Sequence, residues 1–185
     1  MRQRESNSRC GLERSMRISS RCGRSFIRCW SANWRRIALG SFDEVIRERL
    51  QWLRNEVAYL KSERDKIRSF QAYSRNTRLK RAVERSLHLA IEACLDIGRR
   101  LIAQGGFRYP EDNADVFRVL AEHGVVPPEL LPNLIRMARF RNLIVHDYAR
   151  LDDALVYGIL KKQLGDFDAF ARAVVEYLRR SRSTG

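Results

Sequence analysis

Apolar residues from Ser41 onward recur at steps of three and four, and this period most constrains the fold. Such steps place side chains on one face of an α-helix, which turns every ~3.6 residues. The first series is Val45, Ile46, Leu50, Leu53, Val57 and Leu60. No segment sustains the alternation of apolar and polar residues that a half-buried strand needs. The pattern therefore predicts an all-α fold.

Capping and stop residues divide this pattern into a bundle of about five helices. The expected starts are Ser41 or Asp43, about Asn76, Asp112 or Asn113, the run Pro127-Pro128-Glu129, Asp152 or Asp153, and Asp166. The expected stops are Gly105-Gly106 and Gly124. The polar stretch through Asp65 and Ser74 is expected to separate the first two helices. The bundle is expected over residues 41–180, with residues 181–185 as a short tail.

Residues 1–40 differ from this body in charge. They hold ten Arg, no Lys and two Glu, a local charge of +8, whereas residues 41–185 hold 26 basic and 20 acidic residues, or +6. This Arg- and Ser-rich head lacks the apolar region of a secretory signal, so it is an organellar transit peptide, a disordered basic arm or an upstream extension from a misplaced start codon. We expect a basic, disordered extension. The basic body fits an RNA, DNA or phosphate partner.

The spacing of the cysteines and the hydropathy of the chain indicate in which cell compartment the protein is expected. Cys10, Cys22 and Cys29 lie in the head at spacings that fit no zinc motif, and Cys94 stands alone in an apolar helical stretch. Free thiols in a reducing compartment are the expected state. No apolar run reaches the ~18 residues that cross a bilayer. We therefore expect a cytoplasmic protein without a membrane segment, a metal or a cofactor.

The three histidines are the candidates for acid–base chemistry. His88 has Glu84 and Glu92 one turn to either side, which is typical of a solvated or ion-paired surface residue. His123 precedes Gly124 at an expected helix C-terminus, where the helix dipole favours a cation. For both His88 and His123, the sequence therefore favours a structural role over a catalytic one.

His146 differs in its neighbours, because it belongs to the segment Arg141-Asn142-Leu143-Ile144-Val145-His146-Asp147-Tyr148. At about 100° per residue, Arg141 points along the apolar stripe of its helix. Asn142 and His146 lie one turn apart on a neighbouring face, and Tyr148 returns to the side of Arg141. Four hydrogen-bonding groups thus lie on one arc at the edge of an apolar face.

A buried arginine must meet a carboxylate or an anion. One interpretation of Arg141 is an ion pair with Asp153 or Glu92 that only fixes the packing. The other is a phosphate-handling site, because an arginine, an amide, a histidine and a tyrosine lie together. The spacing alone leaves both open.

The segment Arg141–Tyr148 resembles the R-x4-H-x-Y motif of the HepT-like branch of the HEPN superfamily. Members of that branch are toxin ribonucleases of prokaryotic toxin–antitoxin pairs, usually encoded beside a minimal nucleotidyltransferase. Flanking segments are also similar to the family, namely residues 45–50, 82–85, 117–120 and 164–167. The resemblance covers about residues 41–180. Residues 1–40 have no counterpart in it, which favours an extension over a transit peptide.

The resemblance implies a homodimeric up-and-down helical bundle in which the two copies of the motif face each other. It also implies metal-independent cleavage of RNA, in which the 2′-OH attacks the phosphate and leaves a 2′,3′-cyclic phosphate and a 5′-hydroxyl. His146 would be the base in one subunit and the acid in the other. Arg141 would hold the phosphate oxygens, and Asn142 would orient the histidine or the phosphate.

Tyr148 has two interpretations. In the structural one, its hydroxyl supports His146. In the other, which the resemblance favours, the partner nucleotidyltransferase transfers AMP from ATP to Tyr148, and the added negative charge repels RNA. The expected function is thus an endoribonuclease toxin that is neutralised by adenylylation of Tyr148.

Two other function classes remain. The first is a non-catalytic helical dimer module that binds nucleotide or RNA, with Arg141 as an anion anchor and His146 inert. The second is a purely structural dimerisation domain. The intact arginine, asparagine and histidine of the motif favour catalysis over both.

Overall fold

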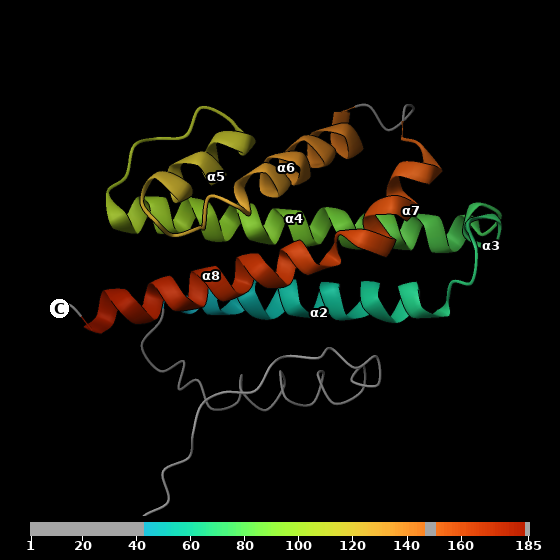
Figure 1. The fold of residues 1–185 in the computed structure, drawn as a ribbon, viewed down its shortest axis with the longest axis horizontal. Helices are drawn as coiled ribbons and strands as arrows, with labels where there is room; N and C mark the ends of the chain where they lie inside the picture. The colour runs from blue at the N-terminus through green and yellow to red at the C-terminus, as the bar shows by residue number, and fades with distance from the viewer. Residues whose placement is uncertain (1–42, 147–150, 184–185) are drawn as a thin grey trace, which may run out of the picture. The chain divides into compact units, whose positions relative to one another are not determined.

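The computed structural model describes residues 43–146 and 151–183, and all of their secondary structure is helical (Figure 1). The helices are α2 (Glu44–Lys66), α3 (Phe70–Ser74), α4 (Thr77–Gly105), α5 (Asn113–Glu122), α6 (Leu131–His146), α7 (Asp153–Lys162) and α8 (Leu164–Ser183). The predicted all-α class is confirmed, with seven helices in this part of the chain instead of about five. The head, residues 1–40, and Tyr148 lie outside the described residues.

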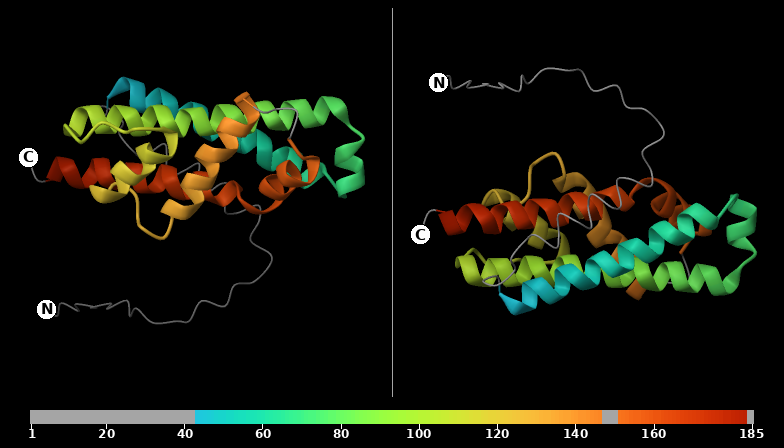
Figure 2. Two further views of the ribbon diagram at one scale, coloured as in Figure 1. Left: turned by 90° about the horizontal axis from the view of Figure 1, so that it is seen from above. Right: turned by 90° about the horizontal axis from the view of Figure 1, so that it is seen from below.

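The long helix α4 is the centre of the bundle and contacts each of the other six described helices. It runs antiparallel to α2, while α5 and α6 both lie over it in the view of Figure 1. The views of Figure 2, from above and from below, show α8 running alongside α2 and α4. Twelve residues of α4 are buried, including Cys94, and burial raises the pKa of its thiol. Cys94 is a core residue, as expected.

Most of the predicted ends are confirmed by their capping geometry. The side chains that accept the first free backbone N–H groups of α2, α4, α5 and α7 are Asp43, Asn76, Asp112 and Asp152. Gly106 ends α4 with a φ of 62°, and Gly124 follows α5 with a φ of 65°. Both angles lie in the left-handed region that glycine adopts without strain.

The polar stretch between the first two helices differs from its prediction, because much of it is helical. α2 continues past Leu60 to Lys66, and α3 forms a single turn capped by Ser69. The end of α2 is stabilised from α7, since Lys161 Nζ donates to the carbonyl oxygens of Arg64 and Ile67 at 2.7 Å each. Lys161 thus satisfies carbonyl groups at the end of α2 that have no partner within the helix. Because 97 and 94 residues separate Lys161 from Arg64 and Ile67, no local sequence pattern could predict these bonds.

The predicted start of α6 at the proline run is wrong by a few residues. The segment forms turns instead, in which Leu130 N donates to Pro127 O at 3.1 Å and Leu131 N donates to Pro128 O at 3.3 Å. These i→i+3 bonds precede the regular helix, which begins at Leu131.

Asp166 was expected to cap the last helix, and this prediction is also wrong. α8 begins two residues earlier, at Leu164, so Asp166 lies inside its first turn. Its Oδ1 accepts a hydrogen bond from Asn133 Nδ2 of α6 at 2.8 Å. The carboxylate therefore joins two helices instead of starting one. At its other end, α8 extends to Ser183, into the expected tail.

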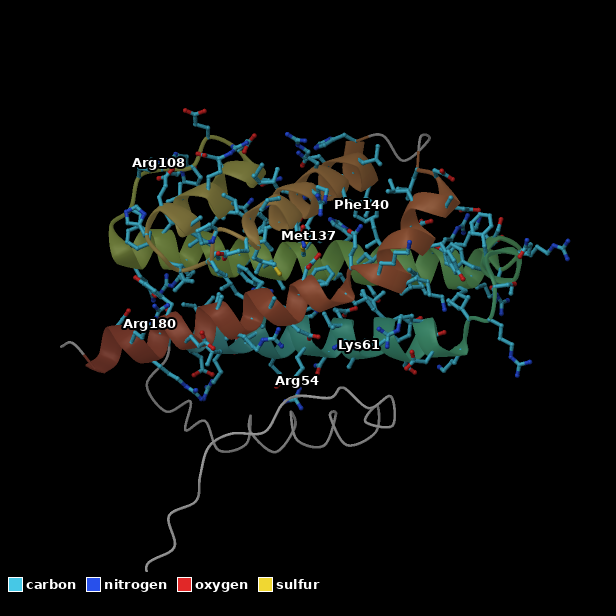
Figure 3. The ribbon with its side chains drawn as sticks, viewed as in Figure 1. Arg54, Lys61, Arg108, Met137, Phe140 and Arg180 are labelled. Carbon is cyan, nitrogen blue, oxygen red and sulfur yellow. The ribbon has the colours of Figure 1, made fainter. Side chains whose placement is uncertain are left out.

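The connection between α4 and α5 is held by Arg108, which is labelled in Figure 3. Its guanidinium bonds Asp115 through two nitrogens at 2.7 and 3.0 Å, and it also bonds Glu122 at 2.8 and 2.9 Å. The backbone N–H of Glu111 donates to Asp115 as well. The Arg108 hydrogen bonds, followed by that of Glu111, hold the pKa of the Asp115 carboxyl well below its usual range. These bonds tie the α4–α5 connection to the first turn and the last residue of α5.

A glycine sets the distance between α4 and α5. A Cβ added at Gly98 would lie 2.6 Å from Val116 Cγ1 and 3.1 Å from Leu120 Cδ1. Only a residue without a side chain permits this approach. Gly158 of α7, by contrast, has no atom within 4 Å of the same position.

We predict that Gly98→Ala lowers the free energy of unfolding by about 1–2 kcal/mol, because the overpacking exceeds the gain in helix propensity. Gly158→Ala is the matched control and should stabilise the protein by about 0.5–1 kcal/mol. Urea unfolding followed by circular dichroism measures both. A Gly98→Ala protein as stable as the control variant would contradict the close approach of the two helices.

Within the described part of the chain, no helix is both long and apolar enough to cross a membrane.

Candidate functional site

The predicted site residues lie at the C-terminal half of α6. Arg141 is partly buried, whereas Asn142 and His146 are exposed, and His146 is the last residue of the helix. Tyr148 lies outside the described residues. The structure brings Arg141 and Asn142 into contact with α4 and α5, while His146 stands one turn beyond Asn142.

Arg141 forms an ion pair with Glu92 of α4, through a hydrogen bond from Nε to Oε1. The side chains are 22% and 26% exposed, so the pair is partly shielded from water. The same carboxylate oxygen of Glu92 lies 3.3 Å from His88 Nε2, as expected for an ion-paired histidine. One of the two predicted partners of Arg141 is therefore confirmed.

The other predicted partner, Asp153, lies elsewhere. Its Oδ2 accepts from Lys80 Nζ at 2.9 Å and from Ser74 Oγ at 3.2 Å. As the first residue of α7, it faces the beginning of α4 instead of the middle. Glu92 is the partner of Arg141 because it is the carboxylate that lies where α6 crosses α4.

The Glu92 contact leaves a part of the Arg141 guanidinium for another ligand. Only Nε bonds the carboxylate, and the described residues give the two terminal nitrogens no hydrogen-bond partner. A guanidinium can present two parallel N–H groups to a phosphate. The ion pair and a phosphate-binding role are thus compatible on the same side chain.

Asn142 is held by a contact that the sequence did not predict. Its Oδ1 accepts from Asn113 Nδ2 of α5 at 3.0 Å, and Asn113 Oδ1 accepts from Arg99 Nη2 of α4 at 2.7 Å. The sequence indicates Asn113 only as a candidate helix cap, and the cap in the structure is Asp112. Because 29 residues separate the two asparagines, no spacing could have indicated the contact.

His146 is exposed and has no hydrogen-bond partner among the described residues. Within the same described ranges, no three His, Cys, Asp or Glu side chains lie close enough to hold a metal ion.

An arginine row leads along α4 to this site. Arg78, Arg81 and Arg85 are exposed and follow at steps of three and four, so they share one helix face with Glu92. Arg99 continues the line beyond Glu92. A row of exposed guanidinium groups suits the phosphates of a nucleic-acid strand.

An apolar groove of about 390 Å³ runs beside the motif helix. Its walls include Met137 and Phe140, which Figure 3 labels on α6, together with Leu143 of the same helix and Leu155 of α7. Leu155 is exposed. The motif helix therefore carries the polar contacts of Arg141 and Asn142 to α4 and α5 and also lines this largely apolar groove.

The bundle has the fold of solved HEPN toxins. The Shewanella oneidensis HEPN toxin, solved tri-AMPylated in complex with the MNT antitoxin, matches with a TM-score of 0.66 and 23% identity over 73% of this chain and 99% of that one. A cytosolic protein of unknown function from Bacillus subtilis matches with a TM-score of 0.64 and 22% identity over 74% and 90% of the two chains. At these identities the likeness defines the fold.

The family follows from the sequence match. Residues 44–174 match the family described as Ribonuclease HepT-like, and the chain belongs to this family. The resemblance drawn from the motif is therefore confirmed.

Two curated relatives add to this assignment. The mRNA nuclease HepT of Shewanella oneidensis is 33% identical over 85 residues, and the tRNA nuclease HepT of Aphanizomenon flos-aquae is 25% identical over 95 residues. These alignments cover 46% and 51% of this chain and 64% and 65% of the relatives. The chain thus spans just under two thirds of each relative.

We predict that Glu92→Gln lowers the free energy of unfolding by about 1–2 kcal/mol, because Arg141 loses a partly shielded charged partner. Glu44→Gln is the matched control, since its pair with Arg47 is exposed and should contribute less than about 0.5 kcal/mol. A double-mutant cycle with Arg141→Gln should give a coupling of about 1 kcal/mol in urea unfolding. A coupling near zero would show that the two side chains do not pair in solution.

Proposed function

We propose that this chain is the endoribonuclease toxin of a toxin–antitoxin pair. Membership in the HepT-like family supports this function, as do the names of the mRNA and tRNA nucleases to which it is similar. The observation that carries the proposal is the arrangement on α6. Arg141 is anchored through Nε beside an oriented Asn142, one turn before the exposed His146.

The proposed reaction uses the nucleophile that RNA itself provides, so it needs no metal. A neutral histidine takes the proton of the 2′-OH while the O2′–P bond forms. The P–O5′ bond then breaks, and a protonated histidine gives its proton to O5′. The products are a 2′,3′-cyclic phosphate and a 5′-hydroxyl. Arg141 and Asn142 stabilise the negative charge that develops on the non-bridging oxygens.

One histidine cannot be base and acid in the same step, so the mechanism needs two. A homodimer with the motifs facing each other supplies His146 twice, once in each protonation state. The apolar groove beside the motif helix supports association of this face with another surface. The arginine row supports RNA as the substrate, because its charges lead along α4 to the motif.

We predict that His146→Ala, assayed with EDTA present, cleaves RNA at least about 10²-fold more slowly and still folds as a dimer, because it loses an acid–base group and no core volume. Arg141→Ala should also inactivate the protein. Arg141→Lys should restore little activity, since an ammonium group cannot form the two parallel bonds. His123→Gln, a change at the C-cap of α5, is the histidine control and should keep its cleavage rate.

Unchanged cleavage by His146→Ala would remove the histidine from the mechanism. A wild-type dimer that binds RNA without cleaving it would instead identify a non-catalytic RNA-binding module. A dimer that neither binds nor cleaves RNA would identify a structural domain.

Control by a partner is the second part of the proposal. A minimal nucleotidyltransferase antitoxin would transfer AMP to Tyr148: the tyrosine oxygen forms a bond to the α-phosphorus of ATP, and pyrophosphate leaves. Each AMP adds a charge of about −1 close to His146, where the RNA phosphate must bind. The tri-AMPylated state of the Shewanella toxin supports this form of control.

We predict that co-expression with the cognate nucleotidyltransferase adds AMP-sized mass increments to the wild-type chain and abolishes cleavage. Tyr148→Phe should keep much of the cleavage, remain unmodified and escape inhibition. Tyr109→Phe is the matched control. Tyr109 is 90% exposed, so it is accessible, but it lies outside the motif and should not be the acceptor; its loss should leave modification and inhibition unchanged. Intact-mass spectrometry decides: increments that persist on Tyr148→Phe would place the acceptor on another residue.

A further inference from the structure

Three side chains from three helices form a chain of hydrogen bonds that ends on the motif. Arg99 of α4 donates from Nη2 to Asn113 Oδ1 of α5 at 2.7 Å. Asn113 Nδ2 in turn donates to Asn142 Oδ1 of α6 at 3.0 Å. Figure 1 shows how α5 and α6 both lie over α4, which allows these three residues to meet.

The first member of this chain sets its direction. An arginine side chain can only donate hydrogen bonds, whereas an asparagine amide has an accepting oxygen on one side and a donating NH₂ group on the other. Arg99 therefore holds the oxygen of Asn113, which turns the NH₂ group of Asn113 to Asn142. Asn142 accepts this bond with its own oxygen. The direction of every amide in the chain follows from one guanidinium group.

The start of this hydrogen-bond chain is tied to α2 by ion pairs on the surface of the bundle. Arg99 Nη1 lies 3.5 Å from Asp96 Oδ1 on the same helix, and Asp96 Oδ2 lies 3.3 Å from Arg49 Nε of α2. Asn113 is the first residue of α5, directly after the cap Asp112. Arg99 therefore has ion-pair contacts beside its hydrogen bond to Asn113, and Asn113 is placed by the capped start of α5.

The consequence concerns the free side of Asn142. Since its oxygen accepts from Asn113, its NH₂ group is the part of the amide that remains for a ligand, at the same end of α6 as Arg141 and His146. An amide in this orientation offers N–H donors to an anion, and the opposite orientation would offer an oxygen that repels it. Donors that are fixed before the substrate arrives stabilise developing charge without a reorientation cost.

We propose that Asn113, oriented by Arg99, is a positioning residue that fixes the amide of Asn142 with its donors toward the RNA phosphate. This inference rests on the proposed ribonuclease function, and it names how that site is kept in its active geometry. Asn113 does not touch the substrate. It acts only through Asn142.

The test reverses the direction of the chain with a substitution of nearly the same shape. In Asn113→Asp the NH₂ group becomes an oxygen, so Asn142 must flip its amide to donate, and it then presents its own oxygen to the phosphate. The variant should fold, because a carboxylate is favoured in the first turn of a helix. Asn55→Asp adds the same charge on α2, where Asn55 accepts a bond from Gln51, and is the matched control.

We expect Asn113→Asp to lower kcat for RNA cleavage by about ten-fold or more, in keeping with the loss of a transition-state donor. Binding of an RNA with a 2′-deoxy nucleotide at the cleavage site, which lacks the nucleophile, should change much less. Asn55→Asp should leave both quantities unchanged. Equal losses in kcat and in binding would instead indicate simple charge repulsion and overturn the proposal.

A second measurement separates an effect through Asn142 from any other effect. In an Asn142→Ala background, Asn113→Asp should have no further effect on kcat, because the residue on which it acts is gone. If the full loss persists in that background, Asn113 acts by another route, and the proposal is wrong.

The positioning can also be measured without cleavage. In NMR spectra of the wild-type protein, the side-chain amide of Asn113 should have a hydrogen-bonded proton whose signal shifts on Asn142→Ala. A protein that shows this shift and cleaves no RNA would refute the proposed function and leave the oriented amide established. A protein that cleaves RNA and shows no shift would refute the positioning and leave the function intact.

Discussion

The packing of α4 against every other described helix is the constraint on which the rest of the structure depends. Its apolar residues are buried along nearly the whole helix, from Val83 to Ile102. A helix buried on this scale contributes most of its stabilisation through the apolar area removed from water. Because α5 and α6 lie against the same helix, its position also sets where the motif residues meet their partners.

The motif helix is tied to this centre by polar contacts as well as by packing. Glu92 engages Arg141, and the pair of Arg99 and Asn113 engages Asn142. Each contact satisfies one part of a side chain and leaves another part for a ligand. Structural and functional roles therefore do not exclude each other here. The same ion pair can stabilise the crossing of α6 over α4 and orient a guanidinium for phosphate.

The charged and polar groups around this site act over two ranges of distance, one long and one short. The arginine row along α4 provides a long-range attraction for a polyanion, which weakens with salt because it acts through solvent. In the proposed ribonuclease, the motif provides short-range donors whose directions are set by hydrogen bonds. A cleaving enzyme needs both, since attraction alone holds a strand without fixing the scissile phosphate.

The sequence by itself determined the helical class, most helix ends and the identity of the motif. These features are local: the apolar period follows from the pitch of the helix, and Asp43, Asn76, Asp112 and Asp152 cap within three residues of their own positions. It also restricted the carboxylate partner of Arg141 to two candidates, because a partly buried arginine needs one.

Only the tertiary structure decided between Glu92 and Asp153, since the choice depends on where α6 crosses α4. The same holds for Lys161 at the end of α2, for Asp166 between α6 and α8, and for Asn113 beside Asn142. Each of these contacts joins residues that are tens of positions apart. Hydrogen bonds of this kind act over about 3 Å and depend on the packing of whole helices, which no local spacing in the sequence encodes.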